Sequence, residues 1–324
     1  MRRAASLAIL LLAAALDAQK ADIRVDVGLV TVACEVTDRN GVPVKSLQVE
    51  DFELRDNDRL QKIDHLWQEQ DLPLTIGLIV DVSGSQSAFI EQHRQTLTQF
   101  LRQVIGAKDR AFLLTIGPEV KLMADLTGSV EALRKGVDDI EGLQLRGVQF
   151  GESCLEAVPY RGCGGTALWN GVYAAARQKM KWVKGRKALI VLSDGLDTGS
   201  PHSLPDAIQS VQEAETVVYA IKYVDPEITP SQAGVSKRGA SIRGLANRGL
   251  ERLTDETGGY TFPNPEDKLA EVFARIEQDL RNQYVLGFTP PEDARDGRFH
   301  KLEVRAQRRN LVVRARVGYY AQSR

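Results

Sequence analysis

The chain has 324 residues, and its 43% hydrophobic content is ordinary for a globular protein with a sizeable core, which excludes disorder throughout. The 42 Lys and Arg residues nearly balance the 43 Asp and Glu residues, so the formal net charge is -1. The chain lacks the basic excess typical of nucleic-acid-binding proteins, and we expect no nucleic acid partner.

Residues 1–18 have the features of a secretory signal peptide. Two arginines precede an apolar segment from Ala4 to Leu16, and small residues follow near a cleavage point. An uncleaved membrane anchor is the alternative, but the apolar segment is shorter than the roughly 20 residues that span a bilayer. We therefore expect a secreted, periplasmic or cell-envelope protein with no transmembrane span after the signal is removed.

Residues 19–72 predict short antiparallel strands. The runs "IRVDVGLVTVACEV" and "DFELRDNDRLQKIDHLW" are rich in β-branched and aromatic residues, and the turn signals Asn40-Gly41 and "DND" interrupt this region. The sequence thus begins, after the signal, with a β-rich segment.

Residues 73–282 change to alternating strands and helices. Apolar runs such as "LTIGLIVDV" and "KALIVLSD" are separated by amphipathic stretches. In the first helix, one face collects Phe89, Leu97, Phe100, Leu101 and Val104. This alternation predicts an α/β fold with a mostly parallel sheet covered on both faces. Residues 225–244 are rich in Gly and Ser and predict a surface loop.

Residues 283–324 return to a strand pattern. The runs "QYVLGFTP", "FHKLEVRA" and "NLVVRARVGYY" are separated by the turn signals Asp296-Gly297 and Arg309-Asn310. We hypothesise that these strands pair with those of residues 19–72 in one β-rich accessory domain.

Oxygen-bearing side chains follow the predicted strands. Asp81, Ser83 and Ser85 come directly after one strand, Asp194 ends another, and Thr166 follows the glycine-rich loop "RGCGGT". Ligands gather at the carboxyl ends of strands in such sheets. Few carboxylates among neutral hydroxyls suit Mg²⁺, with Mn²⁺ or Ca²⁺ as alternatives, and leave a position for a partner's carboxylate.

This pattern resembles the von Willebrand factor A domain with its metal-ion-dependent adhesion site. The motifs "DVSGS", "GGTALWNGV" and "VLSDGLDT" match the family pattern within about residues 73–285. The resemblance implies an α/β fold with a doubly wound sheet, and it implies that Ser83, Ser85 and Thr166 bind the ion directly or nearly so. It implies that Asp81 and Asp194 bind it partly through water. The flanking segments resemble exported bacterial proteins described as VWFA-related.

An insertion, "RGVQFGESCLEAVPYRGC", precedes the glycine-rich loop and lengthens the rim of the expected site. Tyr160 and Arg161 are candidates to contact a partner, although they also fit ordinary loop residues. Asp197 is a further rim candidate that could also accept a hydrogen bond behind Asp194, and a solvated loop residue or a helix cap are the alternatives. We expect Trp169, on the first turn of the next helix, to pack against the sheet.

Three cysteines gain importance from the expected export. Cys154 and Cys163 flank the loop "CLEAVPYRGC" and predict a disulfide, with two free thiols as the alternative. Cys34 lies in an apolar run and predicts a small buried side chain. The sequence has four histidines, His65, His93, His202 and His300. Their spacing is not that of metal ligands, which disfavours a zinc site.

We therefore predict metal-dependent protein binding, in adhesion or assembly of an envelope complex, to a protein that presents an Asp or Glu. The alternatives are a structural envelope module with a non-functional metal site and a metal-dependent hydrolase. The segment "DVSGSQS" lacks the first glycine of a Gly-x-Ser-x-Gly elbow, and no P-loop follows the glycines at 162–165. These features favour binding over catalysis, and we expect that the protein is not an enzyme.

Overall fold

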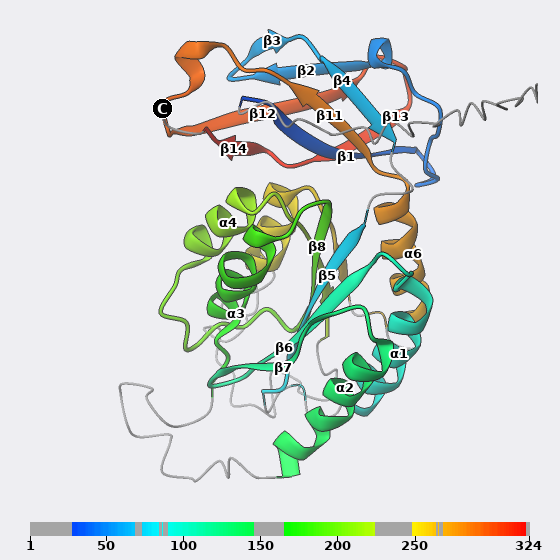
Figure 1. The fold of residues 1–324 in the computed structure, drawn as a ribbon, viewed down its shortest axis with the longest axis vertical. Coiled ribbons are helices and arrows are strands. Elements are labelled where there is room, and N and C mark those ends of the chain that lie inside the picture. The colour runs from blue at the N-terminus through cyan, green and yellow to red at the C-terminus, as the bar shows by residue number, and fades with distance from the viewer. Residues whose placement is uncertain are drawn as a thin grey trace, which may run out of the picture.

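The chain folds into two stacked units, a β-sandwich and an α/β unit (Figure 1). The strands at the blue and red ends of the colour bar form the sandwich, and the middle of the chain forms the α/β unit. The computed structural model describes residues 28–68, 73–83, 86, 90–145, 165–223, 248–263, 265 and 268–321.

The β-sandwich consists of two antiparallel four-stranded sheets, ordered β13-β1-β11-β4 and β14-β12-β2-β3. Alternation along β1 turns Val32, Cys34 and Val36 into the core between the sheets. The pairing of β1 with β11 and β13 joins both ends of the chain in one sheet. The strands are β1 (Val30–Asp38), β2 (Phe52–Asp56), β3 (Arg59–Gln61), β4 (His65–Gln68), β11 (Tyr284–Phe288), β12 (Phe299–Ala306), β13 (Leu311–Ala315) and β14 (Gly318–Tyr320). The 3₁₀ helices η1 (Val49–Asp51) and η7 (Glu292–Ala294) lie in its connections.

The α/β unit contains a six-stranded sheet ordered β10-β9-β8-β5-β6-β7. All neighbouring strands are parallel except β7, which is antiparallel to β6. Read in chain order this is the doubly wound order 3-2-1-4-5-6, so the predicted fold class is confirmed. The strands are β5 (Leu74–Asp81), β6 (Arg110–Ile116), β7 (Val120–Thr127), β8 (Arg186–Ser193), β9 (Val217–Lys222) and β10 (Thr261–Pro263).

Helices cover both faces of this sheet. On one face lie α1 (Ile90–Val104), α2 (Val130–Leu145) and α6 (Leu269–Arg281). On the other lie α3 (Leu168–Ala174) with its continuations η4 (Ala175–Lys179) and η5 (Met180–Trp182), α4 (Leu204–Glu213) and the helix at 248–257. The sequence interpretation missed α2 and β7. The signal for α2 was present in its buried residues Leu133, Val137 and Ile140, whereas β7 is half-exposed and has no clear alternation.

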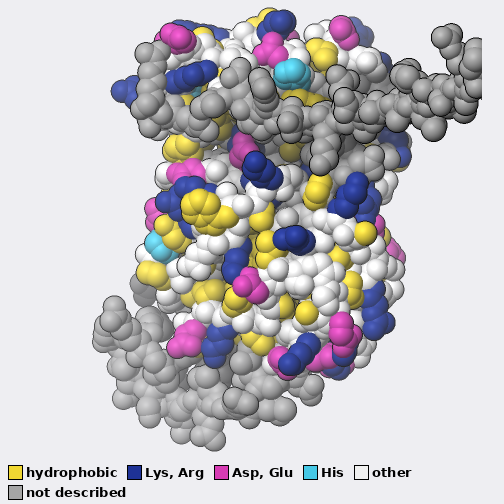
Figure 2. All heavy atoms as spheres, viewed as in Figure 1, with side chains coloured by type: hydrophobic (Ala, Val, Ile, Leu, Met, Phe, Trp, Pro, Cys, Tyr) yellow, Lys and Arg dark blue, Asp and Glu magenta, His cyan; other side chains and the backbone are white. Residues whose placement is uncertain are grey.

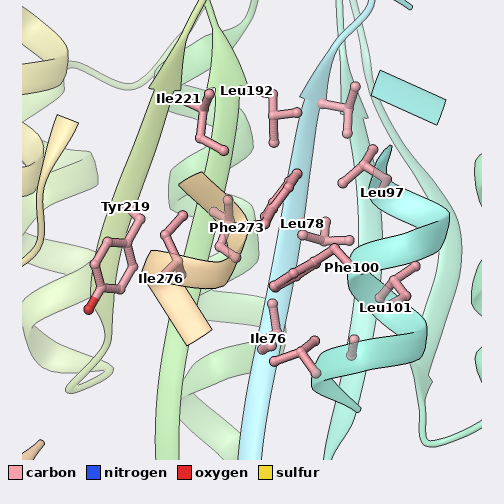
Figure 3. Close-up of a cluster of buried hydrophobic side chains, with 14 of the residues drawn as sticks. Ile76, Leu78, Leu97, Phe100, Leu101, Leu192, Tyr219, Ile221, Phe273 and Ile276 are labelled. Atoms are coloured by element: carbon pink, nitrogen blue, oxygen red, sulfur yellow. The ribbon is translucent and has the colours of Figure 1, made fainter. Parts of the chain in front are cut away.

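The core follows the predicted patterns. Figure 3 shows α1 and α6 directing side chains onto the same strands, with Phe100 and Phe273 stacked at a centroid distance of 4.3 Å. Strand β5 is buried along its whole length, as expected for a central parallel strand. Cys34 is a buried free thiol, which confirms its prediction, and burial raises its pKa to about 12.

The sandwich lies against the amino ends of the parallel strands. Arg186, the first residue of β8, donates from Nη1 to Leu280 O (2.7 Å) at the end of α6, which leads into β11. Glu215, just before β9, accepts from the Thr31 hydroxyl of β1 (3.2 Å). The carboxyl ends of the strands therefore lie at the opposite edge, away from the sandwich.

The visible surface of the molecule carries charges of both signs. Figure 2 shows Lys and Arg side chains interspersed with Asp and Glu side chains over the α/β unit, and no large basic patch on this face. None of the helices in the described ranges is both long enough and apolar enough to cross a membrane.

Candidate functional site

Asp81 is the centre of the candidate site because it ends the buried strand β5 and is itself fully buried. Its Oδ1 accepts from the Ser83 backbone N–H (2.9 Å), and its Oδ2 accepts from the Ser193 hydroxyl (2.6 Å). Burial raises the pKa of Asp81 to about 6 because it penalises the charged form. Hydrogen bonds from Ser193 and Ser83 lower this pKa, and the charge of Asp194 raises it; none of these groups is a cation.

The loop that carries Thr166 is fixed against the same edge. The Ala167 N–H donates to Gly117 O (2.8 Å), just beyond β6, and the Val82 N–H donates to Ile116 O (2.8 Å). The loops after β5 and before α3 are therefore anchored to neighbouring residues at the end of β6. Thr166 is buried at this point.

Asp194 occupies the third loop, directly after β8. Its Oδ1 accepts from the Leu196 N–H (2.9 Å), and Gly195 takes a positive φ of 84°, which favours glycine and turns the chain sharply. Thr198 in this loop holds the loop of Thr166 in place. Its Oγ1 accepts from the Thr166 N–H (3.0 Å), and its N–H donates to Thr166 O (3.0 Å). Asp81, Ser83, Thr166 and Asp194 thus share one edge of the sheet.

Asp197 has a structural role in the same loop. Its Oδ1 accepts from the Trp169 N–H (3.1 Å) and from the Ser200 hydroxyl, so it satisfies a free amide at the start of α3. Trp169 is buried in the core beneath this helix, which confirms the packing prediction. Five predicted residues lie outside the described residues, and their roles stay predictions: Ser85, Cys154, Tyr160, Arg161 and Cys163.

Ser193 and Thr198 were not identified from the sequence, although both position site residues. Ser193 directly precedes Asp194, but its contact with Asp81 depends on the register of β5 and β8, in which Val80 lies opposite Leu192. The signal available in the sequence was only a hydroxyl at a strand end.

The donor set fits a hard divalent cation. The charge of Asp194 is close enough to raise the pKa of Asp81, and the hydrogen-bonding groups around Asp81 are neutral. Within the described ranges, no three His, Cys, Asp or Glu side chains gather as a metal cluster. Carboxylates with hydroxyls are the oxygen donors that Mg²⁺, Mn²⁺ and Ca²⁺ take.

Ser193→Ala is expected to raise the pKa of Asp81 above its value of about 6, by about one pH unit. The Ser193 hydroxyl stabilises the carboxylate form, and alanine leaves that oxygen without this donor. Titration of the Asp81 carboxyl carbon by NMR without added metal measures the change. Ser200→Ala is the control because that hydroxyl donates to Asp197. An Asp81 pKa that is equal in wild type and Ser193→Ala would show that this hydrogen bond does not stabilise the carboxylate.

No protein-family model and no curated protein matches the sequence. Several solved structures are similar to the chain. BatB from Bacteroides thetaiotaomicron is 13% identical, with 63% of this chain and 98% of that chain covered and a TM-score of 0.45. Proximal thread matrix protein 1 from the mussel byssus, with a zinc-occupied MIDAS motif, is 13% identical, with 69% and 49% covered and a TM-score of 0.46. The N-terminal domains of the type V pili tip protein Mfa5 from Porphyromonas gingivalis are 11% identical, with 77% and 56% covered and a TM-score of 0.45. With TM-scores below 0.5, these likenesses are too distant to transfer a function to this chain.

Proposed function

We propose that Asp81, Ser83, Ser85, Thr166 and Asp194 bind a divalent cation, and that this ion binds a carboxylate of a partner protein. The observation that carries the proposal is the buried carboxylate of Asp81, which lies near a second carboxylate and has neutral hydrogen-bond donors around it. A cation at this edge relieves the repulsion between the two carboxylates.

The described residues of the proposed site are held in position by hydrogen bonds. Asp81 is held in place by Ser83 and Ser193, and Thr166 is fixed by the backbone contacts of its loop. When bound, the ion supplies a positive charge that the few carboxylates leave partly uncancelled, and so attracts an outside Asp or Glu. Mg²⁺ suits a site with few carboxylates, and Mn²⁺ and Ca²⁺ share its preference for oxygen.

The resemblance of the three motifs to the von Willebrand factor A domain supports binding as the use of this site. We propose that residues 73–282 are the binding domain and that residues 19–72 with 283–324 form one accessory domain. Residues 1–18 would direct export and then be removed, so the mature protein would lie in the cell envelope or outside the cell. Binding rather than catalysis is the activity that we propose.

A pull-down of a partner from a preparation of envelope proteins tests this function. The immobilised wild-type chain is expected to retain a partner in Mg²⁺ and to release it in EDTA. Asp194→Asn keeps an oxygen for the Leu196 N–H but removes the charge, and a loss of metal affinity of about 10- to 100-fold is expected, with matching loss of the partner.

Ser200→Ala is the matched control, because Ser200 contacts Asp197 and the Asn170 N–H (2.9 Å) rather than a proposed ion ligand. It is expected to retain the partner as wild type does. Retention that survives EDTA, or that is equal in wild type and Asp194→Asn, would contradict the proposed site and favour a structural module.

A further inference from the structure

Two carboxyl side chains meet in the joint between the sandwich and the α/β unit. Glu35 lies on β1, on the face opposite to the sandwich core, and Asp279 lies on α6. Their exposed fractions are only 4% and 1%. They are 244 positions apart in the sequence, so only docking of the two units brings them together.

A single guanidinium serves both carboxyls. Arg275 Nη2 donates to Glu35 Oε1 (2.9 Å), and Arg275 Nε lies 2.7 Å from Asp279 Oδ1. Arg275 Nη1 also donates to Gly41 O in the sandwich. Asp279 Oδ1 is buried and accepts no well-aligned hydrogen bond from any described residue. One cation therefore faces two buried acids, which are balanced only when one acid is neutral.

The other groups around this cluster do not supply a second cation to Asp279. Burial, then the charge and hydrogen bond of Glu35, raise the pKa of Asp279 to about 8, and Arg275 opposes this rise. Tyr219 of β9 faces the two acids. Burial, and then the charges of Asp279 and Glu35, raise the pKa of its hydroxyl, so Tyr219 is a neutral phenol, and it forms a hydrogen bond with Gln283. Figure 3 shows its hydroxyl pointing away from the apolar cluster. Arg314 lies opposite Glu35 in the register of β13 and β1, but its guanidinium lies 4.4 Å from the centroid of the Tyr260 ring. Among the described residues, the ion pairs of Glu35 and Asp279 are those with Arg275.

We propose that docking of the sandwich onto the α/β unit takes up one proton, which Glu35 and Asp279 share beside Arg275, so that the joint tightens in acid and loosens as the pH rises. With the proton present, one carboxyl donates to the other and a single negative charge faces Arg275. Without it, two buried negative charges repel each other across the joint. The cluster lies at the opposite edge of the sheet from Asp81 and needs no metal.

The direction follows from proton linkage. When the joint is open, Asp279 is exposed to water and its pKa returns towards the ordinary 3.8; when the joint is closed, its pKa is about 8. Between these values the closed state binds the proton and the open state releases it. The ratio of closed to open molecules therefore falls with rising pH across this window, by up to about tenfold per pH unit, and levels off above about pH 8.

A backbone hydrogen bond provides a reporter of this joint. The Val317 N–H of the sandwich donates to Glu256 O of the helix at 248–257 (3.3 Å), so its protection from hydrogen exchange depends on docking. Strand β1 in the sandwich and strand β5 in the α/β unit are each paired on both sides and report unfolding of their own units.

Amide hydrogen exchange of the full chain between pH 5 and 9, corrected for the intrinsic exchange rate, tests the proposal. In wild type, protection of the Val317 amide is expected to fall as the pH rises to about 8, while β1 and β5 hold theirs. Asp279→Asn removes the titrating group and is expected to make the Val317 protection independent of pH. Glu35→Gln is the second variant, with the same expectation, should Asp279→Asn fail to fold.

Glu277→Gln is the matched control, because Glu277 lies on the same helix but pairs with Arg281 at the surface. It is expected to keep the wild-type pH profile. The proposal is overturned if Val317 protection in wild type does not change with pH, if the folded variant keeps the wild-type profile, or if β1 and β5 lose protection in parallel.

Discussion

Mg²⁺ at about 100 times its wild-type Kd is expected to stabilise the wild-type chain strongly and Asp194→Asn much less, because the variant is expected to bind the ion about 10- to 100-fold more weakly. A ligand that binds only the folded state adds about 2.7 kcal/mol when its free concentration is about 100 times its Kd. For units of this size that corresponds to a rise in Tm of roughly 5–10 °C. The reason lies in the two carboxylates near each other at the end of β5 and β8, whose repulsion the ion removes.

Differential scanning calorimetry of both proteins, with and without metal, measures this difference. Asp194→Asn is the informative variant because its side-chain oxygen still accepts from the Leu196 N–H, so the loop after β8 keeps its turn. Ser200→Ala is expected to gain as much Tm as wild type does. Equal gains in wild type and Asp194→Asn would mean that the metal acts elsewhere, and repeating the titration with Mn²⁺ and Ca²⁺ ranks the ions.

Gly259→Ala is expected to destabilise the fold by about 3 kcal/mol or more. A Cβ at Gly259 would lie 1.8 Å from Val218 O and 2.7 Å from Val218 C, which are backbone atoms of strand β9, paired on both sides in the sheet. The preceding Gly258 has a positive φ of 86° and lies against the Arg316 N–H of the sandwich. The chain between the helix at 248–257 and β10 therefore has no room to move aside.

Urea denaturation gives the loss as a shift of the unfolding midpoint. Gly199→Ala is the matched control, because a Cβ there meets nothing within 4 Å, and its stability is expected to stay within about 0.5 kcal/mol of wild type. A loss below about 1 kcal/mol for Gly259→Ala would mean that β9 accommodates the methyl group by a backbone shift.

Local patterns in the sequence were sufficient for the fold class and for most of the elements, although α2 and β7 were missed. Period-two and continuous apolar runs predicted the strands, and the stripe of Leu97, Phe100, Leu101 and Val104 is buried as expected for α1. These signals are strong because burial on one face imposes a spacing on the chain itself. Strand β7 was not predicted because it is half-exposed at the sheet edge, where burial imposes no such spacing on the apolar residues.

The candidate site was only partly visible in the sequence. The motifs of Asp81, Thr166 and Asp194 stand at strand and loop ends, where chemistry gathers in this fold. The partners that position them, Ser193 and Thr198, depend on strand register and on loop packing, which no local spacing encodes.

The sequence by itself determined most of the strands and helices, the α/β class with a mostly parallel sheet, and which oxygens follow its strands, because these properties depend on neighbours a few residues apart. Only the tertiary structure decided that both ends of the chain form one sandwich, and that Glu35, Arg275 and Asp279 meet in its joint. Contacts between residues some 240 positions apart depend on the docking of whole units, and the free energy of that docking is distributed over many side chains rather than recorded in a local pattern.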